Sequence, residues 1–258
     1  MADIQNTGLL SRLFRSGHAY QEIKEILSQA RPKGRCLDLP AGKGVNLKGI
    51  RQAGFEPVAC DLFPECIEKD SAFRAGADFS QNLPFADNSF EAVLCSEGVE
   101  HCPVQLDLIR EFSRVLLPGG TLLITTPNIL NYRARAAFML TGQSSLARDP
   151  VSEVTHVRRE STGSRLYMGH VFLLSYFQLR FLLKISGFSD IRVYTAKYSM
   201  SSVILAPFLW LPVKLFTRRV FAAKAGKKDP RAFAEILRHA LSRDILLGKK
   251  LIISARKD

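Results

Sequence analysis

The residues whose chemistry is easiest to interpret are two aspartates and the glycine-bearing turn between them. Asp38 ends a short apolar run, and the turn Pro40-Ala41-Gly42-Lys43-Gly44 follows it closely. Glycine lets the backbone approach a ligand where a side chain would block it. Asp61 follows one crossover later, where an acidic side chain can accept hydrogen bonds from both ribose hydroxyls. These residues predict a nucleotide site.

The same turn argues against a dinucleotide as the ligand. The third glycine of the pattern G-x-G-x-x-G would fall at Leu47. A carboxylate at Asp38 would repel a pyrophosphate, but it could accept hydrogen bonds from an ammonium group. A ligand that carries both adenosine and an amino acid therefore fits best.

The elements that must position these residues are a strand, a helix and a second strand. Residues 35–39 are typical of a buried strand, residues 45–53 of the following helix, and residues 58–60 of a strand that leads into Asp61. In a doubly wound sheet, ligands bind outside the carboxyl ends of the strands. Strands and helices then continue to alternate along the chain, which favours one large domain.

Three further motifs follow in an order that is typical of one family. They are Gly76-Ala77-Asp78-Phe79, the segment Leu83 to Ser96, and Leu116 to Ile124 with its Pro118-Gly119-Gly120. With these motifs, residues 34–188 resemble the class I S-adenosylmethionine-dependent methyltransferases, and the strand expected at 250–255 also fits. One departure is Pro40, where the family more often has glycine.

The resemblance implies an α/β fold with a doubly wound, Rossmann-like, seven-stranded sheet, mostly parallel with an antiparallel last strand. Within the family, the chain is most similar to the small-molecule branch that includes ubiquinone-pathway O-methyltransferases and bacterial cell-envelope methyltransferases. The implied cofactor is S-adenosyl-L-methionine. The turn and Asp38 would face its methionine moiety, Asp61 with Leu62 its ribose, and Asp78 with Phe79 its adenine. The expected cofactor-binding residues are Asp38, Pro40, Ala41, Gly42, Gly44, Asp61, Leu62, Asp78, Phe79 and Ser96.

Two histidines are the candidate catalytic residues. Methyl transfer from a sulfonium is an in-line displacement, so the protein mainly aligns the acceptor and, for a hydroxyl, removes its proton. His101 is the first candidate because an unperturbed imidazole titrates near neutrality. His170 is the second, because the segment before the next helix often closes over the substrate in this family. The alternative for each is a histidine that holds a loop through backbone hydrogen bonds.

A metal site is a further alternative at the first of these histidines. Glu97, Glu100 and His101 match an E-x-x-E-H arrangement that resembles metal-binding ubiquinone-pathway O-methyltransferases. A divalent cation there would bind adjacent oxygens of a catechol and lower the pKa of the phenol. The spacing also occurs in relatives not known to need a metal, so no metal is part of the prediction.

The segment 203–224 is not needed by a minimal methyltransferase. It is rich in apolar residues, but its apolar core is shorter than the roughly 20 residues of a transmembrane helix, and two prolines interrupt it. Val213, Phe216, Val220 and Ala223 fall on one helical face, with basic residues elsewhere, which is typical of an in-plane membrane helix. The alternative is an apolar insertion that packs on the domain or forms a dimer interface.

The predicted organisation is an N-terminal helical cap over residues 1–33 and a methyltransferase domain over residues 34–258. The domain carries a substrate-region insertion at 127–170 and an apolar, basic, membrane-type insertion at 199–230. The net charge of +12 favours phosphate-bearing partners, either nucleic acid, anionic lipid or a phosphorylated substrate. Five scattered cysteines and the lack of a secretory signal at Met1 predict a reducing cytoplasm.

The predicted function is methyl transfer to a small-molecule, lipid-linked or glycan acceptor, with O-methylation at the cytoplasmic face of a membrane. RNA methylation is the alternative that charge alone favours. We do not expect nucleic acid as the partner, because an appended RNA-binding module and an N-P-P-Y type signature are both missing. A catalytically inactive cofactor-binding scaffold is a further alternative. The acceptor atom and the oligomeric state stay open.

Overall fold

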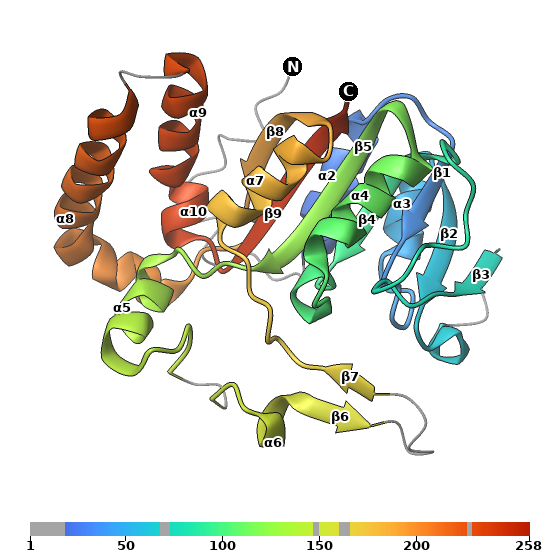
Figure 1. The fold of residues 1–258 in the computed structure, drawn as a ribbon, viewed down its shortest axis with the longest axis horizontal. Coiled ribbons are helices and arrows are strands. Elements are labelled where there is room, and N and C mark those ends of the chain that lie inside the picture. Colours follow the sequence, from blue (N-terminus) through green and yellow to red (C-terminus); the bar gives the residue numbers. More distant parts are fainter. Residues whose placement is uncertain (1–18, 68–72, 147–149, 160–165, 226–228) are drawn as a thin grey trace.

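The computed structural model describes residues 19–67, 73–146, 150–159, 166–225 and 229–258. Its centre is a seven-stranded sheet of order β3-β2-β1-β4-β5-β9-β8 (Figure 1). Neighbouring strands are parallel except at β9, which is antiparallel to both β5 and β8. The strands are β1 (Arg35–Asp38), β2 (Glu56–Asp61), β3 (Phe73–Gly76), β4 (Phe90–Ser96), β5 (Leu116–Pro127), β8 (Phe188–Tyr194) and β9 (Lys250–Lys257). The predicted doubly wound sheet is confirmed.

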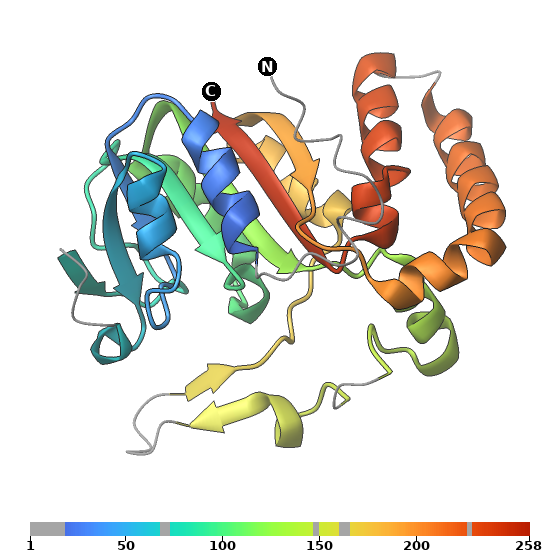
Figure 2. The ribbon, with the colours of Figure 1, turned by 180° about the vertical axis from the view of Figure 1, so that it is seen from behind.

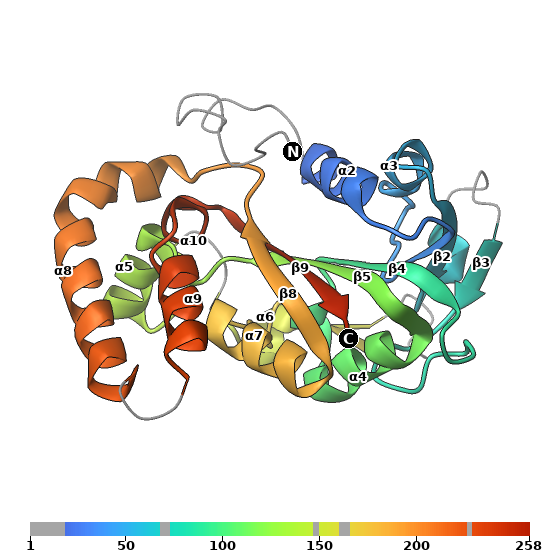
Figure 3. The same ribbon diagram turned by 90° about the horizontal axis from the view of Figure 1, so that it is seen from above.

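Helices cover both faces of this sheet (Figure 3). One face is covered by α2 (Tyr20–Gln29) and α3 (Leu47–Gln52), and the other by α4 (Gln105–Val115) and α7 (Tyr176–Ile185). Consecutive side chains of a strand point to opposite faces, so in β1 Cys36 packs towards α2 and α3, and Leu37 packs into the other core. Because the strands are apolar and buried on both faces, their polar residues lie at the strand ends.

The N-terminal cap is described in part. Its helix α2 packs on the sheet through Ile23, Ile26 and Leu27, which are buried beside α3. The rest of the predicted cap, residues 1–18, lies outside the described residues. The described part therefore packs on the domain through its apolar face.

The substrate-region insertion begins at the carboxyl end of β5. It contains α5 (Tyr132–Thr141), α6 (Glu153–His156) and the two-stranded sheet of β6 (Val157–Arg159) and β7 (Leu166–Met168). Asn131 caps α5 by accepting a hydrogen bond from Ala134 N at 2.8 Å. Figure 2 shows β6 and β7 as an arm that extends away from the main sheet on the side of its carboxyl ends.

A helical hairpin lies beyond β8 (Figure 1). It consists of α8 (Met200–Ala225) and α9 (Pro230–Ala240), and the short helix α10 (Arg243–Leu247) leads back into β9. The rings of Phe221 on α8 and Phe233 on α9 pack with centroids 5.9 Å apart. This ring contact holds α8 and α9 side by side.

The expectation that segment 203–224 is too short to cross a membrane is wrong. The two prolines, Pro207 and Pro212, do not interrupt α8, which is one continuous helix. Residues Met200–Ala223 have the length and composition of a membrane-crossing helix. A proline removes one backbone donor and bends a helix, but the turns on either side can continue. Figure 3 shows α8 as a curved helix.

Candidate functional site

The carboxyl ends of β1, β2 and β4 meet at one edge of the sheet, and the glycine turn lies over them. Ala41 N donates to Cys60 O at 2.9 Å, and Leu39 N donates to Leu94 O at 2.9 Å. These bonds hold the start of the turn between the neighbouring strands. The structure therefore brings the predicted turn and the predicted strand ends together.

Asp38 is a buried carboxylate that lacks a partner. It is 0% exposed, and neither of its oxygens has a hydrogen-bond partner among the described residues. Burial raises the pKa of Asp38 to about 8, an effect that the Asn46 side chain opposes and that the charge of Asp61 reinforces. An unpaired buried acid of this kind is costly unless a cation or a donor completes it. The ammonium group of the expected cofactor suits it.

The carboxylate of Asp61 stabilises the glycine turn by accepting a backbone hydrogen bond. Its Oδ2 accepts a hydrogen bond from Gly42 N at 2.8 Å, and its Oδ1 accepts one from Phe63 N at 3.0 Å. Gly42 has φ +54° and Gly44 has φ +83°, values that side chains disfavour. The fixed carboxylate and the bare backbone together fit a ribose and the groups attached to it. Leu62, half-buried, follows directly.

Asp78 and Phe79 lie on the loop after β3. Ala77 N donates to Asp61 O at 3.0 Å, which ties this loop to the end of β2. Asp78 Oδ1 accepts from Ser80 N at 2.8 Å and from Ser80 Oγ at 2.6 Å. The Phe79 carbonyl faces Cys102 Sγ at 3.7 Å. The carboxylate of Asp78 thus stabilises its own loop, and the loop lies next to the Asp61 end of the site.

The loop after β4 packs closely on the turn. A side chain at Gly98 would clash with the ring of Pro40, so glycine is required there. Ser96 Oγ lies 3.2 Å from Thr125 Oγ1 on β5. Proline at the position where the family more often has glycine is thus accommodated by the missing side chain at Gly98.

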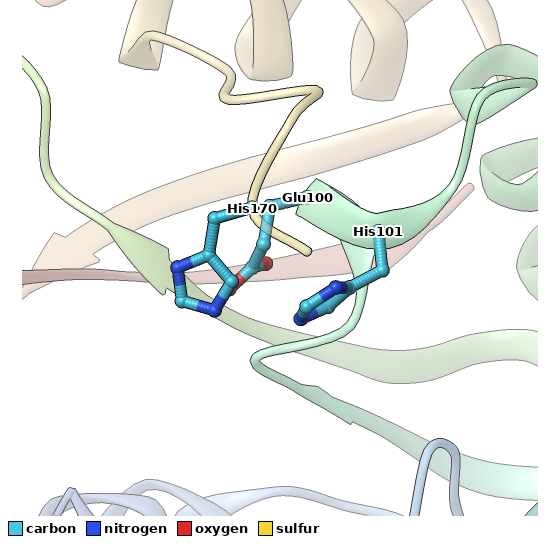
Figure 4. A group of neighbouring side chains, drawn as sticks. All are labelled: Glu100, His101 and His170. Atoms are coloured by element: carbon cyan, nitrogen blue, oxygen red, sulfur yellow. The ribbon is translucent and has the colours of Figure 1, made fainter. Parts of the chain in front are cut away.

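The structure brings the two candidate histidines, His101 and His170, together although they lie far apart in the chain. Their rings pack edge to face with centroids 4.8 Å apart (Figure 4). His101 ends the short helix η3 (Val99–His101), and His170 lies in the loop after β7. The prediction that both histidines lie near the ends of β4 and β5 agrees with this geometry.

Backbone and side-chain hydrogen bonds hold the two loops in contact. Phe172 N donates to Glu100 O at 3.0 Å. Gln105 Nε2 donates to Val99 O at 2.9 Å and to Phe172 O at 2.6 Å, so one amide joins both loops. Gln105 has no sequence signal of its own, because its role depends on a contact between distant segments.

Glu100 lies between the histidines and was not among the predicted catalytic residues (Figure 4). It is 0% exposed, and Oε2 accepts a hydrogen bond from Thr126 Oγ1 at 3.0 Å. Oε1 lies 3.9 Å from His170 Nε2, which is too long for a hydrogen bond. Burial raises the pKa of Glu100 to about 8, and the charge of Glu97 adds to the rise. The E-x-x-E-H spacing was the sequence signal for this residue.

Glu97, Glu100 and His101, the residues of the possible magnesium site, do not converge on one point. Glu97 Oε2 pairs with Lys250 Nζ at 3.1 Å, and Glu97 Oε1 accepts from Thr125 Oγ1 at 3.1 Å. The ligand atoms that come within 4.8 Å of one another belong instead to Glu100, His101 and His170. Two nitrogens and one oxygen suit a transition metal ion better than Mg²⁺, which prefers oxygen ligands. The residues therefore do not fit the magnesium site that the spacing alone indicates.

Two asparagines anchor the start of the insertion to α10 and to the residue that follows it. Asn128 Nδ2 donates to Ile245 O at 2.8 Å and to Gly248 O at 2.9 Å, and Asn131 Nδ2 donates to the same Gly248 O at 2.9 Å. Of its arginines, Arg135 is half-buried and donates through Nε to Leu130 O at 2.7 Å. Arg148 and Arg165 lie outside the described residues.

Comparison with known proteins gives one family and a group of relatives. A family model described as a methyltransferase domain matches residues 12–193. A demethylmenaquinone methyltransferase of Beutenbergia cavernae is 35% identical over 120 residues, which are 43% of this chain and 49% of that protein. A ubiquinone biosynthesis O-methyltransferase of Xanthomonas campestris pv. campestris is 33% identical over 138 residues, 48% of this chain and 55% of that protein. The chain thus spans about half the length of these relatives.

Solved structures share the fold. A SAM-dependent methyltransferase from Archaeoglobus fulgidus superposes with a TM-score of 0.55 at 17% identity, covering 96% of this chain and 98% of that chain. The Haemonchus contortus phosphoethanolamine N-methyltransferase 2, solved with S-adenosyl-L-methionine, gives a TM-score of 0.53 at 18% identity, covering 92% of this chain and 52% of that chain.

Proposed function

The chain belongs to the S-adenosylmethionine-dependent methyltransferases, and from that premise we propose that it methylates an oxygen of a small-molecule, lipid-linked or glycan acceptor at the cytoplasmic face of a membrane. The observation that carries the proposal is the pairing of His101 and His170 at the same sheet edge as the unpaired Asp38. The residues predicted to bind the cofactor and His101 follow the carboxyl ends of strands of the same sheet, and His170 packs against His101, which supports the proposal. The relative named for ubiquinone biosynthesis is an O-methyltransferase, which favours an oxygen acceptor.

The cofactor would be held by the predicted residues at the carboxyl edge. S-adenosyl-L-methionine supplies a methyl group that is already activated by the positive sulfur. Asp38 would accept hydrogen bonds from the ammonium group, and the open space beside Gly42 would leave room for the chain that carries it. Asp61 would accept hydrogen bonds from the ribose hydroxyls. The remaining contacts are assigned to Pro40, Ala41, Leu62, Asp78, Phe79 and Ser96.

The histidines would act on the acceptor. A hydroxyl becomes a good nucleophile only when its proton leaves, and a neutral imidazole nitrogen held within hydrogen-bond distance can take that proton. His101 is fixed by η3 at the end of β4, whereas His170 comes from the insertion that shapes the acceptor side. We propose His101 as the first candidate for the base that accepts the proton of the acceptor, and His170 as the second. The buried Glu100 lies beside His170, with its Oε1 3.9 Å from His170 Nε2.

The first test separates cofactor binding from transfer. His101→Asn and His170→Asn variants are expected to bind S-adenosylhomocysteine as the wild type does, and to lose transfer by about 100-fold for the principal base. Binding is measured by calorimetry, and transfer by the incorporation of labelled methyl groups into extracted lipid, glycan and small-molecule fractions. Unchanged transfer in both variants would remove the histidines from the mechanism.

The methyl acceptor is identified by mass spectrometry of the labelled fraction. A methyl ether on an aromatic or sugar hydroxyl is the expected product. A methyl group on RNA would favour the RNA alternative, whose binding should also fall steeply with salt. If the protein does not bind S-adenosylhomocysteine measurably, it is an inactive scaffold.

The membrane-face location rests on charge and on the hairpin. A net charge of +12 attracts anionic lipid, and α8 supplies an exposed apolar helix next to basic residues. We propose that the protein is cytoplasmic and associates peripherally with the inner face of the membrane. Cell fractionation tests this location: salt or carbonate should release the protein from membranes, whereas an integral protein would stay.

A further inference from the structure

We infer that one face of α8, with the neighbouring end of α5, docks in the plane of an anionic lipid bilayer, an inference that rests on the proposed function and names the partner of the enzyme. The exposed row on α8 consists of Ile204, Phe208, Leu211 and Leu215, at the spacing of one helical face. Phe208 is 75% exposed. Large apolar side chains in such a row are rare on surfaces that meet only water.

A second helix adds to this surface. Phe138, Met139 and Leu140 at the end of α5 are exposed, Met139 by 78%. The helix α5 packs against α8, and Figures 1 and 2 show the two helices at the same corner of the molecule. Because α5 begins shortly after the carboxyl end of β5, this corner adjoins the edge that holds the candidate site.

The opposite face of α8 is held by the domain. Val203, Ala206, Leu209 and Val213 pack against a cluster of buried residues, Tyr132, Tyr198, Leu246 and Leu247. The helix therefore has two apolar faces, one towards the protein and one outwards. The face predicted from the sequence, which began at Val213, is wrong at that residue, although Phe216 and Val220 are exposed.

The contacts of α8 with the domain indicate whether this helix lies in the plane of the bilayer or crosses it. By length and composition α8 could cross a membrane, but a crossing helix must present apolar side chains to lipid all around. Here Val203, Ala206, Leu209 and Val213 on one side are half-buried against the domain, and Phe221 near the far end packs against Phe177 of α7, with ring centroids 6.1 Å apart. Crossing would break both sets of contacts, so the helix lies in the plane.

Charge identifies the bilayer as the occupant. The described residues of α8 include basic but no acidic side chains, and Arg218 and Arg219 are exposed. Lys214 Nζ lies 4.3 Å from the centroid of the Trp210 ring, which pairs an interfacial aromatic residue with a cation. A second copy of the chain would bring like charges together. Anionic headgroups would neutralise them.

Flotation with vesicles tests the inference on the full-length chain. Wild type is expected to float with vesicles of phosphatidylcholine and phosphatidylglycerol, and to bind vesicles of phosphatidylcholine alone at least about tenfold less. Phe208→Glu and Leu211→Glu should each reduce binding to the anionic vesicles by more than about tenfold. Phe73→Glu, at an exposed phenylalanine of β3, is the matched control and should float as wild type does.

Two further measurements make every outcome decisive. Melting temperature and S-adenosylhomocysteine binding should match in all variants, which shows that they fold. If wild type stays soluble, or if the glutamate variants still float, the inference is overturned. Sedimentation that shows a dimer lost in the glutamate variants overturns it in favour of self-association. Methyl transfer without vesicle binding refutes the docking surface alone, whereas vesicle binding without cofactor binding refutes the proposed enzyme.

Discussion

Asp38 is the residue whose environment says most about the ligand. Its carboxylate is buried at the end of β1 with no hydrogen-bond partner among the described residues, and its raised pKa of about 8 means that it holds a proton near neutrality when no ligand is bound. A cationic ligand would favour the ionised form. The same side chain therefore links cofactor binding to pH.

Cofactor affinity is expected to rise with pH in a way that depends on Asp38. Binding of the ammonium group ionises the carboxyl, so binding releases a proton below the raised pKa of about 8. Affinity for S-adenosylhomocysteine should then increase by up to about tenfold per pH unit below that value and level off above it. Calorimetry in buffers of different ionisation enthalpy measures both the affinity and the released proton.

Asp38→Asn should bind more weakly and lose this pH dependence, because an amide cannot ionise. We expect a loss of about 1 to 3 kcal/mol of binding free energy at alkaline pH. Asp107→Asn, at an exposed aspartate of α4, is the control. A wild-type affinity that is flat across this pH range would contradict the assignment of Asp38.

The paired histidines predict a distinct response to metal ions. Chelation is expected to leave methyl transfer unchanged, because Glu97 is engaged by Lys250 and the magnesium set is incomplete. Added Zn²⁺ should inhibit, because Glu100, His101 and His170 can converge on it and remove the proton acceptors. Initial rates with Zn²⁺, and their recovery after chelator, check this. Methyl transfer that is lost after chelation and restored by Mg²⁺ would show instead that the enzyme needs a magnesium ion.

At the scale of elements, the site depends on a contact between η3, α4 and the loop after β7. Gln105, in the first turn of α4, donates hydrogen bonds to carbonyls of both loops, those of Val99 and Phe172. Removing its amide leaves two carbonyls without this donor. The loop that carries His170 should then become less well positioned.

Gln105→Ala is therefore expected to reduce turnover by about tenfold while cofactor affinity stays within about twofold of wild type. Steady-state kinetics with the identified acceptor and calorimetry with S-adenosylhomocysteine give the two quantities. Arg110→Ala, on the exposed side of the same helix, serves as the control. Equal losses in both variants would point to a general effect on α4.

The helix α8 shows why element patterns can mislead. Its two apolar faces leave little polar contrast around the helix, so one face alone could not be identified from periodicity. Its prolines suggested an end where the helix only curves. The packing of neighbouring helices decides which apolar face is buried, and that packing involves residues far away in the sequence.

At the scale of the molecule, polar contacts join α9 of the hairpin to α7, which covers one face of the sheet. His239 Nδ1 on α9 lies 2.8 Å from Tyr176 Oη on α7, and Arg180 forms two hydrogen bonds with Glu235 at 3.1 and 2.9 Å. Burial lowers the pKa of His239 to about 4, and the charge of Arg238 contributes. The hairpin therefore stays attached when His239 is neutral.

Acid should weaken this attachment. Since the pKa of His239 is lower in the folded protein than in the unfolded chain, its contribution to stability is complete above about pH 6.5 and is lost progressively towards pH 4. The free energy of unfolding should fall by about 1 to 3 kcal/mol more in wild type than in His239→Gln over that range. Urea denaturation at each pH measures it. Parallel pH profiles in the two proteins would exclude His239 as the cause.

The sequence was sufficient for the fold and for the prediction that Asp38, the glycine turn and Asp61 lie together at the carboxyl ends of the strands. Strand composition, the turn at Gly42 and Gly44, and aspartates at strand ends are local signals, and parallel strands necessarily bring their carboxyl ends to one edge. The sheet order and the antiparallel β9 agree with that expectation. The positions of Asp38 and Asp61 follow from the chain near them.

By itself, then, the sequence determined the sheet and the candidate residues: the aspartates and glycines proposed to bind the cofactor, and the two histidines proposed as bases. Only the tertiary structure decided that His101 and His170 touch, that Glu97 faces Lys250, and that α8 turns one apolar face inwards and one outwards. The physical reason is how far apart in the sequence the interacting residues lie. Periodicity and turn chemistry act between residues a few positions apart, whereas these contacts join segments that meet only when the chain has folded.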